Sequence, residues 1–232
     1  MLLRARIAAC LERKRLFDEL RIEQERSEAL LLNILPRAVV ARMRQGETVI
    51  ADRIPEATVL FSDLVDFTGL SATLAPEETV KLLGLLFSQF DDLAVRCRLE
   101  PIKTIGDGYM VTSGVLERRP DGAIAVAEMG LSMLEITETA GTSFDGKLQL
   151  RIGIHTGGPM VAGVLGTHKL AFDVWGDAVN TAKRMETYGW PGRVHVSAAT
   201  RQALGNAFRF EPRGPLDIKG KGPMETYFLY RR

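Results

Sequence analysis

The stretch TVLFSDLVDFTGLS, residues 58–71, guides the interpretation of the rest of the chain. Its first residues, Thr58–Phe61, suit a covered, pleated surface, so a buried strand is predicted here. Asp63 and Asp66 follow while the neighbouring residues are still apolar. A carboxylate that leaves a buried strand costs several kcal/mol if it stays charged and unpaired. Asp63 therefore needs a partner that compensates its charge.

Length and composition are those of an ordinary globular protein. The chain has 232 residues, 46% hydrophobic and 25% charged, which suits one large domain or one domain with an extension. A formal net charge of +1 gives no sign of a nucleic-acid partner. No run of about 18 apolar residues occurs, so no membrane span is predicted. Cys10 and Cys97 lie far apart in the sequence, which favours reduced thiols in a cytoplasmic protein.

The N-terminal 34 residues are rich in Leu, Arg, Glu and Ala, and the first proline is Pro36, so a helix is predicted. Leucine and isoleucine recur as a broken heptad that the polar run EQERSE, residues 23–28, interrupts. Two interpretations stay open: a helix packed on its own domain, and a short parallel coiled coil between two subunits. We expect a helical signalling segment over residues 1–44 and a second domain over residues 45–232.

From Thr58 onward, strand-like and helix-like patterns alternate. Strands are predicted over residues 58–62, 101–105, 109–113, 148–155, 160–164 and 226–230, and helices over 76–97, 123–138 and 177–186. The turn Gly106-Asp107-Gly108 between two short strands is typical of a hairpin. The order β-α-β-β-α-β predicts an α+β fold with a ferredoxin-like core, extended by further strands and helices.

Two aspartates fall where a predicted strand meets a turn: Asp63 follows its strand, and Asp107 lies in the hairpin turn. Gly106 and Gly108 allow a tight turn and leave space for a ligand. If the strand of Asp63 lies beside the hairpin, both carboxylates reach one point, and such a pair is typical of Mg²⁺ or Mn²⁺ sites. Taken alone, the two residues are equally well explained as ordinary turn aspartates.

Groups that suit phosphate binding are spread along the chain. Residues 66–69 resemble the start of a helical turn, whose N–H groups can face a phosphate. The motif GxxxxGK[ST] is absent, which excludes a P-loop. Arg151 in LRIGIH and Lys219 in IKGKG are candidate phosphate ligands, although a single cation is usually an ordinary surface residue.

Asn180 and Arg184 are four residues apart on the helix predicted over 177–186, so they share one of its faces. An amide and a guanidinium on one face can donate hydrogen bonds to a charged oxygen in a transition state. A solvated helix face explains the same spacing more simply. His155 lies in an apolar strand and is interpreted as a core residue with a hydrogen-bond partner.

Five motifs then stand in one order: FSDLVDFT (61–68), IKTIGDGYMV (102–111), RIGIHTG (151–157), FDVWGDAVNTAKRME (172–186) and KGKG (219–222). Together they resemble the catalytic domain of class III nucleotide cyclases, over about residues 57–230. The GG(D/E)EF signature of diguanylate cyclases is absent. A guanylyl cyclase and a non-catalytic dimerisation module are the alternatives.

The resemblance implies cyclisation of a nucleoside triphosphate with two Mg²⁺ or Mn²⁺ ions. Asp63 and Asp107 would bind the ions with help from the Leu64 carbonyl, and the ions, not protein cations, would compensate the charge of Asp63. Asn180 would position the ribose, and Arg184 would stabilise charge on the α-phosphate. The phosphates would be held by Phe67, Thr68, Gly69, Arg151 and Lys219.

The base is expected to be adenine, because Lys103 can donate to adenine N1 and Asp173 can accept from its 6-amino group. The resemblance thus implies an adenylyl cyclase that converts ATP to cyclic AMP. It also implies a homodimer in which one subunit supplies the metal aspartates and the other the base-reading and transition-state residues. The N-terminal run LLRARIAACLERKRL weakly resembles the end of a receiver domain, so we expect an upstream receiver or other sensor.

Overall fold

The computed structural model describes residues 2–142 and 148–232, without the side chains of residues 2, 3, 5, 8 and 9. Its contacts divide the chain into two compact units. One unit contains the chain up to Ile50 together with Gly163–Phe172. The other contains Ala51–Ala162 and Asp173–Arg232.

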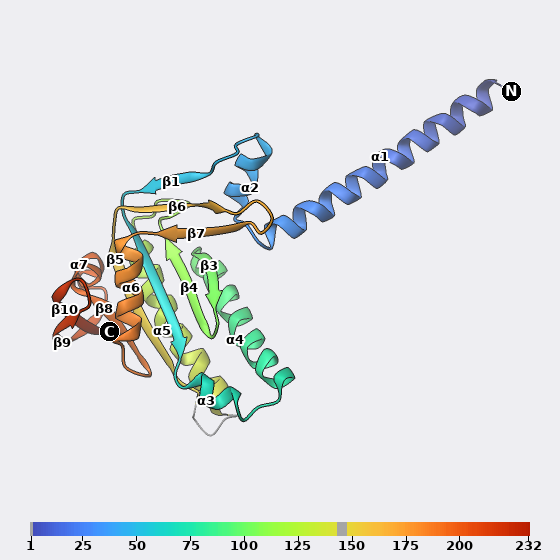
Figure 1. Cartoon of the computed structure of the whole chain (residues 1–232). Coiled ribbons are helices and arrows are strands. Elements are labelled where there is room, and N and C mark those ends of the chain that lie inside the picture. The colour runs from blue at the N-terminus through green and yellow to red at the C-terminus, as the bar shows by residue number, and fades with distance from the viewer. Residues whose placement is uncertain (1, 143–147) are drawn as a thin grey trace. The chain divides into compact units, whose positions relative to one another are not determined.

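The first unit begins with two helices, α1 (Leu2–Leu32) and α2 (Arg37–Arg44) (Figure 1). Pro36 lies between them as the N-cap of α2. Ion pairs one turn apart, such as Arg15–Glu19 at 2.9 Å, support the surface of α1. Large apolar side chains on α1, among them Leu11 at 62% exposure, face solvent. Within the described residues, no helix is long and apolar enough to cross a membrane.

The second unit is built on a seven-stranded sheet with the order β3-β4-β2-β5-β8-β10-β9. Its strands are β2 (Ala57–Leu64), β3 (Glu100–Ile105), β4 (Gly108–Ser113), β5 (Leu150–Gly157), β8 (Arg193–Ser197), β9 (Arg209–Ile218) and β10 (Gly222–Tyr230). Its helices are α3 (Phe67–Ser71), α4 (Pro76–Cys97), α5 (Gly122–Gly141), α6 (Asp177–Thr187) and α7 (Ala198–Leu204). A three-stranded sheet has the order β1-β6-β7, from β1 (Ala51–Ile54), β6 (Met160–Leu165) and β7 (Ala171–Trp175).

The predicted ferredoxin-like core is confirmed. Strands β3, β4, β2 and β5 are neighbours in that order and all antiparallel, with α4 after β2 and α5 after β4 (Figure 1). The extension begins with β8, which pairs in parallel with β5 and is followed by the antiparallel strands β10 and β9. The α+β fold class and the N-terminal helix are therefore as the sequence predicted.

The two faces of the seven-stranded sheet pack against different helices. On one face, Leu60 of β2 and Ile152 of β5 pack under Gly130 of α5, in a core that also contains buried residues of α4. On the other face, Gly153 of β5 lies so close to α6 that an added Cβ would overlap the backbone of Glu186. The strand register places the candidate site residues Lys103, Asp63 and Arg151 on this second face.

Candidate active site

The two predicted metal aspartates lie at adjacent strand ends, and Leu64, the third predicted ligand, is the last residue of β2. Asp63 pairs with Gly108 across β2 and β4, and Asp107 occupies the two-residue turn between β3 and β4. Gly106 in this turn has φ +62°, a conformation that favours glycine. At Gly108 an added Cβ would stand 3.3 Å from Asp63 Oδ1, so glycine lets the turn pack against the carboxylate. The predicted hairpin is confirmed.

Asp107 lies in a partly buried place beside a second carboxylate, and such a place favours binding of a cation. Burial, and then the negative charge of Asp63, raise the pKa of the Asp107 carboxyl, while Lys183 and Arg151 oppose that rise. A divalent cation between the two carboxylates would remove their repulsion, and oxygen is the ligand that Mg²⁺ and Mn²⁺ prefer. The residues present thus fit such an ion. The described residues hold no cluster of three or more His, Cys, Asp or Glu, so carbonyls, water or substrate oxygens would complete its coordination.

Arg151 corrects the expectation that metal ions alone compensate Asp63. Its Nη2 donates to Asp63 Oδ2 at 3.0 Å across the β2–β5 register. Its Nε lies 3.3 Å from Oε1 of Glu186, and Lys183 Nζ lies 2.6 Å from the other oxygen of that carboxylate. A protein cation therefore already pairs with Asp63. The assignment of Arg151 to phosphate stays a prediction.

Glu186 is a site residue that the motif analysis passed over. Its side chain is only 1% exposed, although glutamate is almost never fully buried unless it is paired. It follows Met185 on the buried side of α6, which also carries Ala178 and Ala182. The sequence did contain one sign of this residue, because Glu186 is a charged residue that continues the apolar face of the helix. The sequence could not show that Arg151 and Lys183 would pair with its carboxylate.

The predicted base-reading residues come together. Lys103 of β3 donates from Nζ to Oδ2 of Asp173 of β7 at 2.5 Å. The other oxygen of Asp173 accepts the backbone N–H of Val174 at 2.8 Å. The side chain of Asp173 is 17% exposed and that of Lys103 is 39% exposed, so a ligand can reach the pair from the lysine side.

Helix α6 carries Asn180 and Arg184, four residues apart as predicted. Asn180 is exposed. Arg184 has a buried Nη1 without a hydrogen-bond partner in the described parts of the chain. An added Cβ at Gly220 would be 3.8 Å from that nitrogen, so the loop between β9 and β10 lies beside Arg184. Lys219 is an exposed residue of the same loop.

Residues 66–69 form the start of the short helix α3. Asp66 lies in the turn before α3 with φ 51° and occupies the N-cap position of that helix. Its side chain makes no cap hydrogen bond to α3. An added Cβ at Gly69 would be 2.9 Å from Asp66 Oδ1, so glycine leaves room for the Asp66 carboxylate in its present position. The assignment of Phe67, Thr68 and Gly69 to phosphate stays a prediction.

Two histidines are structural. His155 Nδ1 lies 2.7 Å from Ser197 Oγ, and His195 Nδ1 lies 2.7 Å from the Met185 carbonyl oxygen. Burial is the main cause that lowers the pKa of each imidazole to about 4. Both rings are therefore neutral at pH 7, and His195 must be the donor to the Met185 carbonyl. His155 is a partnered residue, as interpreted from the sequence.

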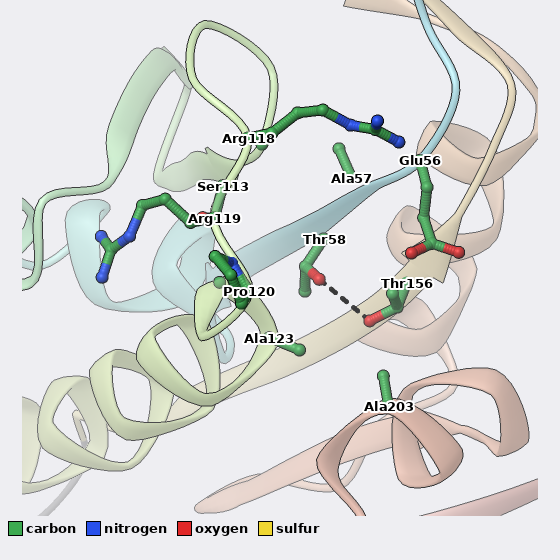
Figure 2. A pocket seen from close by; sticks show the side chains of 12 residues that line it. Glu56, Ala57, Thr58, Ser113, Arg118, Arg119, Pro120, Ala123, Thr156 and Ala203 are labelled. Atoms are coloured by element: carbon green, nitrogen blue, oxygen red, sulfur yellow. Dashed lines mark hydrogen bonds between the residues drawn. The ribbon is translucent and has the colours of Figure 1, made fainter.

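A pocket of about 390 Å³ lies at the opposite end of β2 from Asp63 (Figure 2). Its floor includes Thr58 and Thr156, whose hydroxyls are 3.0 Å apart. Arg119 at its edge points away and donates to the carbonyls of Cys97 and Arg98. Its described lining residues include none of the three predicted metal ligands and none of the predicted base-reading residues. We interpret the pocket as a gap between packed elements.

The fold agrees with the family comparison. The adenylate and guanylate cyclase catalytic domain matches residues 49–231 of the chain. The chain belongs to this family and contains a nucleotide cyclase catalytic domain.

Individual relatives include both kinds of cyclase. An adenylate cyclase of Mycobacterium tuberculosis (strain ATCC 25618 / H37Rv) is 42% identical over 211 residues, 90% of this chain and 47% of the relative. The chain thus spans about half the length of this curated relative. The catalytic core of a rhodopsin-guanylyl cyclase with converted specificity, solved with ATPαS, is 35% identical with a TM-score of 0.73, over 78% of this chain and 98% of that one. The guanylate cyclase domain of RhGC from Catenaria anguillulae, solved with GTP, is 34% identical with a TM-score of 0.73, over 78% of this chain and 99% of that one.

Proposed function

We propose that the chain is an adenylyl cyclase that converts ATP to 3′,5′-cyclic AMP and pyrophosphate. The observation that carries this proposal is the pair Lys103–Asp173, joined at 2.5 Å. An ammonium and a carboxylate side by side offer a donor next to an acceptor. The Watson–Crick edge of adenine offers the complement, an acceptor at N1 and a donor at the 6-amino group. Guanine presents the reverse, an acceptor at O6 and a donor at N1. In the same position, the Lys103 donor would face the donor at N1, and the Asp173 acceptor would face the acceptor at O6.

The remaining residues have roles that follow from their positions. Asp63 and Asp107, helped by the Leu64 carbonyl, would hold two ions, and Mg²⁺ or Mn²⁺ bound there would lower the pKa of the ribose 3′-hydroxyl and polarise the phosphates. Arg184 stabilises charge that develops on the α-phosphate, and its support is an Nη1 donor that has no hydrogen-bond partner within the described residues. Asn180, exposed on the same helix, positions the ribose. The outer phosphates are bound by Arg151, by Lys219 and by Phe67, Thr68 and Gly69 at the start of α3.

The proposal includes a homodimer with two equivalent sites. The metal aspartates of one subunit face the base-reading pair and α6 of the other. The supporting observation is that one chain carries both sets of residues. Residues 45–232 act as the catalytic domain, in a cytoplasmic protein with the two free cysteines reduced.

Residues 1–44 are proposed as a signalling segment that pairs across the dimer and couples an upstream receiver or other sensor to the site. The exposed apolar side chains of α1, such as Leu11, Leu16 and Leu20, support pairing because a partner helix would cover them. A truncation that begins at Arg37 should still cyclise ATP at high protein concentration, with a dimer dissociation constant raised at least about tenfold. Sedimentation with parallel assays measures both, and an unchanged dimer contradicts the pairing.

The function itself is tested by incubating the chain with ATP or GTP and either Mg²⁺ or Mn²⁺, and measuring both cyclic nucleotides. We expect cyclic AMP as the main product. Cyclic GMP in equal or larger amount would favour the guanylyl cyclase alternative. A folded dimer that makes neither product with either ion would indicate a non-catalytic signalling module.

A further inference from the structure

Charged side chains gather where β2, β5 and α6 meet, and the most deeply buried of them is Glu186. A carboxylate at 1% exposure is tolerated only if cations compensate it. Lys183 supplies one cation from the preceding turn of α6, at 2.6 Å. Arg151 supplies the other from β5, at 3.3 Å. Glu186 thus anchors two cations close to the proposed metal ligands.

The guanidinium of Arg151 is shared between two carboxylates. Toward Asp63 it makes an aligned hydrogen bond of 3.0 Å from Nη2. Toward Glu186, the distance of 3.3 Å between Arg151 Nε and Glu186 Oε1 suits an ion pair. Both atoms are buried, and neither makes a hydrogen bond within the described residues. The contact with Glu186 is therefore charge attraction without good alignment, and small rotations of the guanidinium change how it divides between the two anions.

We propose that Glu186 is a positioning residue of the cyclase site and acts through Arg151. As a fixed buried anion, Glu186 draws the guanidinium partly off Asp63 and so leaves that carboxylate available to a divalent cation. Arg151 compensates Asp63 in the ion-free protein and turns to Glu186 and the phosphates when an ion binds. Binding of the ion is thus an exchange of partners.

This exchange predicts opposite effects for two neighbouring substitutions on the affinity for Mn²⁺ without nucleotide. Arg151→Met removes the competitor for Asp63, so Mn²⁺ should bind about tenfold more tightly. Glu186→Gln keeps the shape but removes the anchor, so Arg151 pairs fully with Asp63 and Mn²⁺ should bind about tenfold more weakly. Mn²⁺ binding is followed by electron paramagnetic resonance of the free ion, and circular dichroism checks that both variants fold.

A double variant separates action through Arg151 from the plain loss of a negative charge. In the Arg151→Met background, Glu186→Gln should change the Mn²⁺ affinity by less than about threefold. Asp177→Asn is the matched control, because it removes an exposed carboxylate of the same helix that pairs with Lys221. It should leave the affinity within about twofold of the wild type. Glu186→Asp keeps the charge and should restore part of the affinity lost in Glu186→Gln.

Two results would overturn the inference. One is an unchanged Mn²⁺ affinity in a folded Glu186→Gln variant. The other is an equal loss of affinity on Glu186→Gln whether or not Arg151 is present, which would mean that Glu186 acts only through its field. The further proposal that Arg151, positioned by Glu186, contacts the phosphates rests on the proposed function. It predicts that Glu186→Gln raises the KM for ATP. If the wild type made no cyclic nucleotide but the Mn²⁺ affinities behaved as stated, the proposed function would fail and the positioning role would stand.

Discussion

Asp63 and Asp173 are both carboxylates paired with a cation, but their surroundings differ. Both oxygens of Asp173 have a partner, the Lys103 ammonium and the Val174 N–H. Asp63 shares the guanidinium of Arg151 with Glu186, and the second contact lacks hydrogen-bond alignment. The proposed base-reading pair is therefore held in place by contacts within the protein, as selective recognition requires. On the proposed metal side, Arg151 has two carboxylates to pair with, so an ion can take the place of one contact.

The largest expected effect comes from removing a metal carboxylate. Asp63→Asn or Asp107→Asn should lower cyclase activity by about 10³-fold or more, because the ions supply several kcal/mol of charge stabilisation. Folding should persist, since in Asp63→Asn the guanidinium of Arg151 still has Glu186. Assays with Mn²⁺ and thermal melts measure the two quantities. Substantial activity in either variant would remove that aspartate from the metal side.

A mixing experiment tests whether the two sides of one site come from different subunits. Asp63→Ala inactivates the metal side of its own chain, and Arg184→Ala inactivates the transition-state side. With random exchange, half the dimers are mixed and each has one intact site of two, so activity should recover to about a quarter of wild type per chain. If exchange is demonstrated by labelled subunits and activity stays absent, each site is built within one chain.

The base side is expected to give a smaller, selective effect. Lys103→Glu combined with Asp173→Cys removes the donor and the acceptor of the adenine edge, and should lower the preference for ATP over GTP by about 10²-fold or more. The Mn²⁺ requirement should not change, because these residues do not contact the metal carboxylates. Ratios of kcat/KM for the two nucleotides measure the effect. A wild-type chain that uses both nucleotides equally would contradict the donor–acceptor argument.

The smallest effect concerns the scaffold under both sides. His195 has a pKa of about 4 when folded and about 6.5 when unfolded, so the unfolded chain binds more protons between these values. Its contribution to stability is complete above about pH 6.5 and is lost as the pH falls toward 4, up to about 3 kcal/mol. Asp107 acts in the opposite sense, because its pKa is raised.

Urea unfolding at pH 7.5 and 5 measures this loss. His195→Gln should lower stability at pH 7.5 and weaken the dependence on pH, while Asp107→Asn should not weaken it. An unchanged pH dependence in a folded His195→Gln variant would contradict the assignment to this histidine.

Much of the fold was predictable because local patterns were strong. The helix predicted over residues 76–97 has exactly these bounds as α4, since Pro76 starts it and the apolar period is regular. Other elements were harder. The last strand was expected from Thr226 and begins at Gly222, because pairing with β9 extends it through glycine and proline. The short strand β1, with the sequence ADRI, has little strand character of its own and was not predicted.

The sequence by itself determined which residues are proposed to carry the chemistry of the cyclase site. Aspartates at strand ends, the amide and guanidinium one turn apart, and the ordered motifs are local features, and local features can be read from the order of residues. Only the tertiary structure decided the charge partners. Arg151 lies 88 residues from Asp63, and Lys103 lies 70 residues from Asp173. Such pairs depend on strand register and on the approach of α6 to the sheet, and whether Glu186 is buried depends on the same approach.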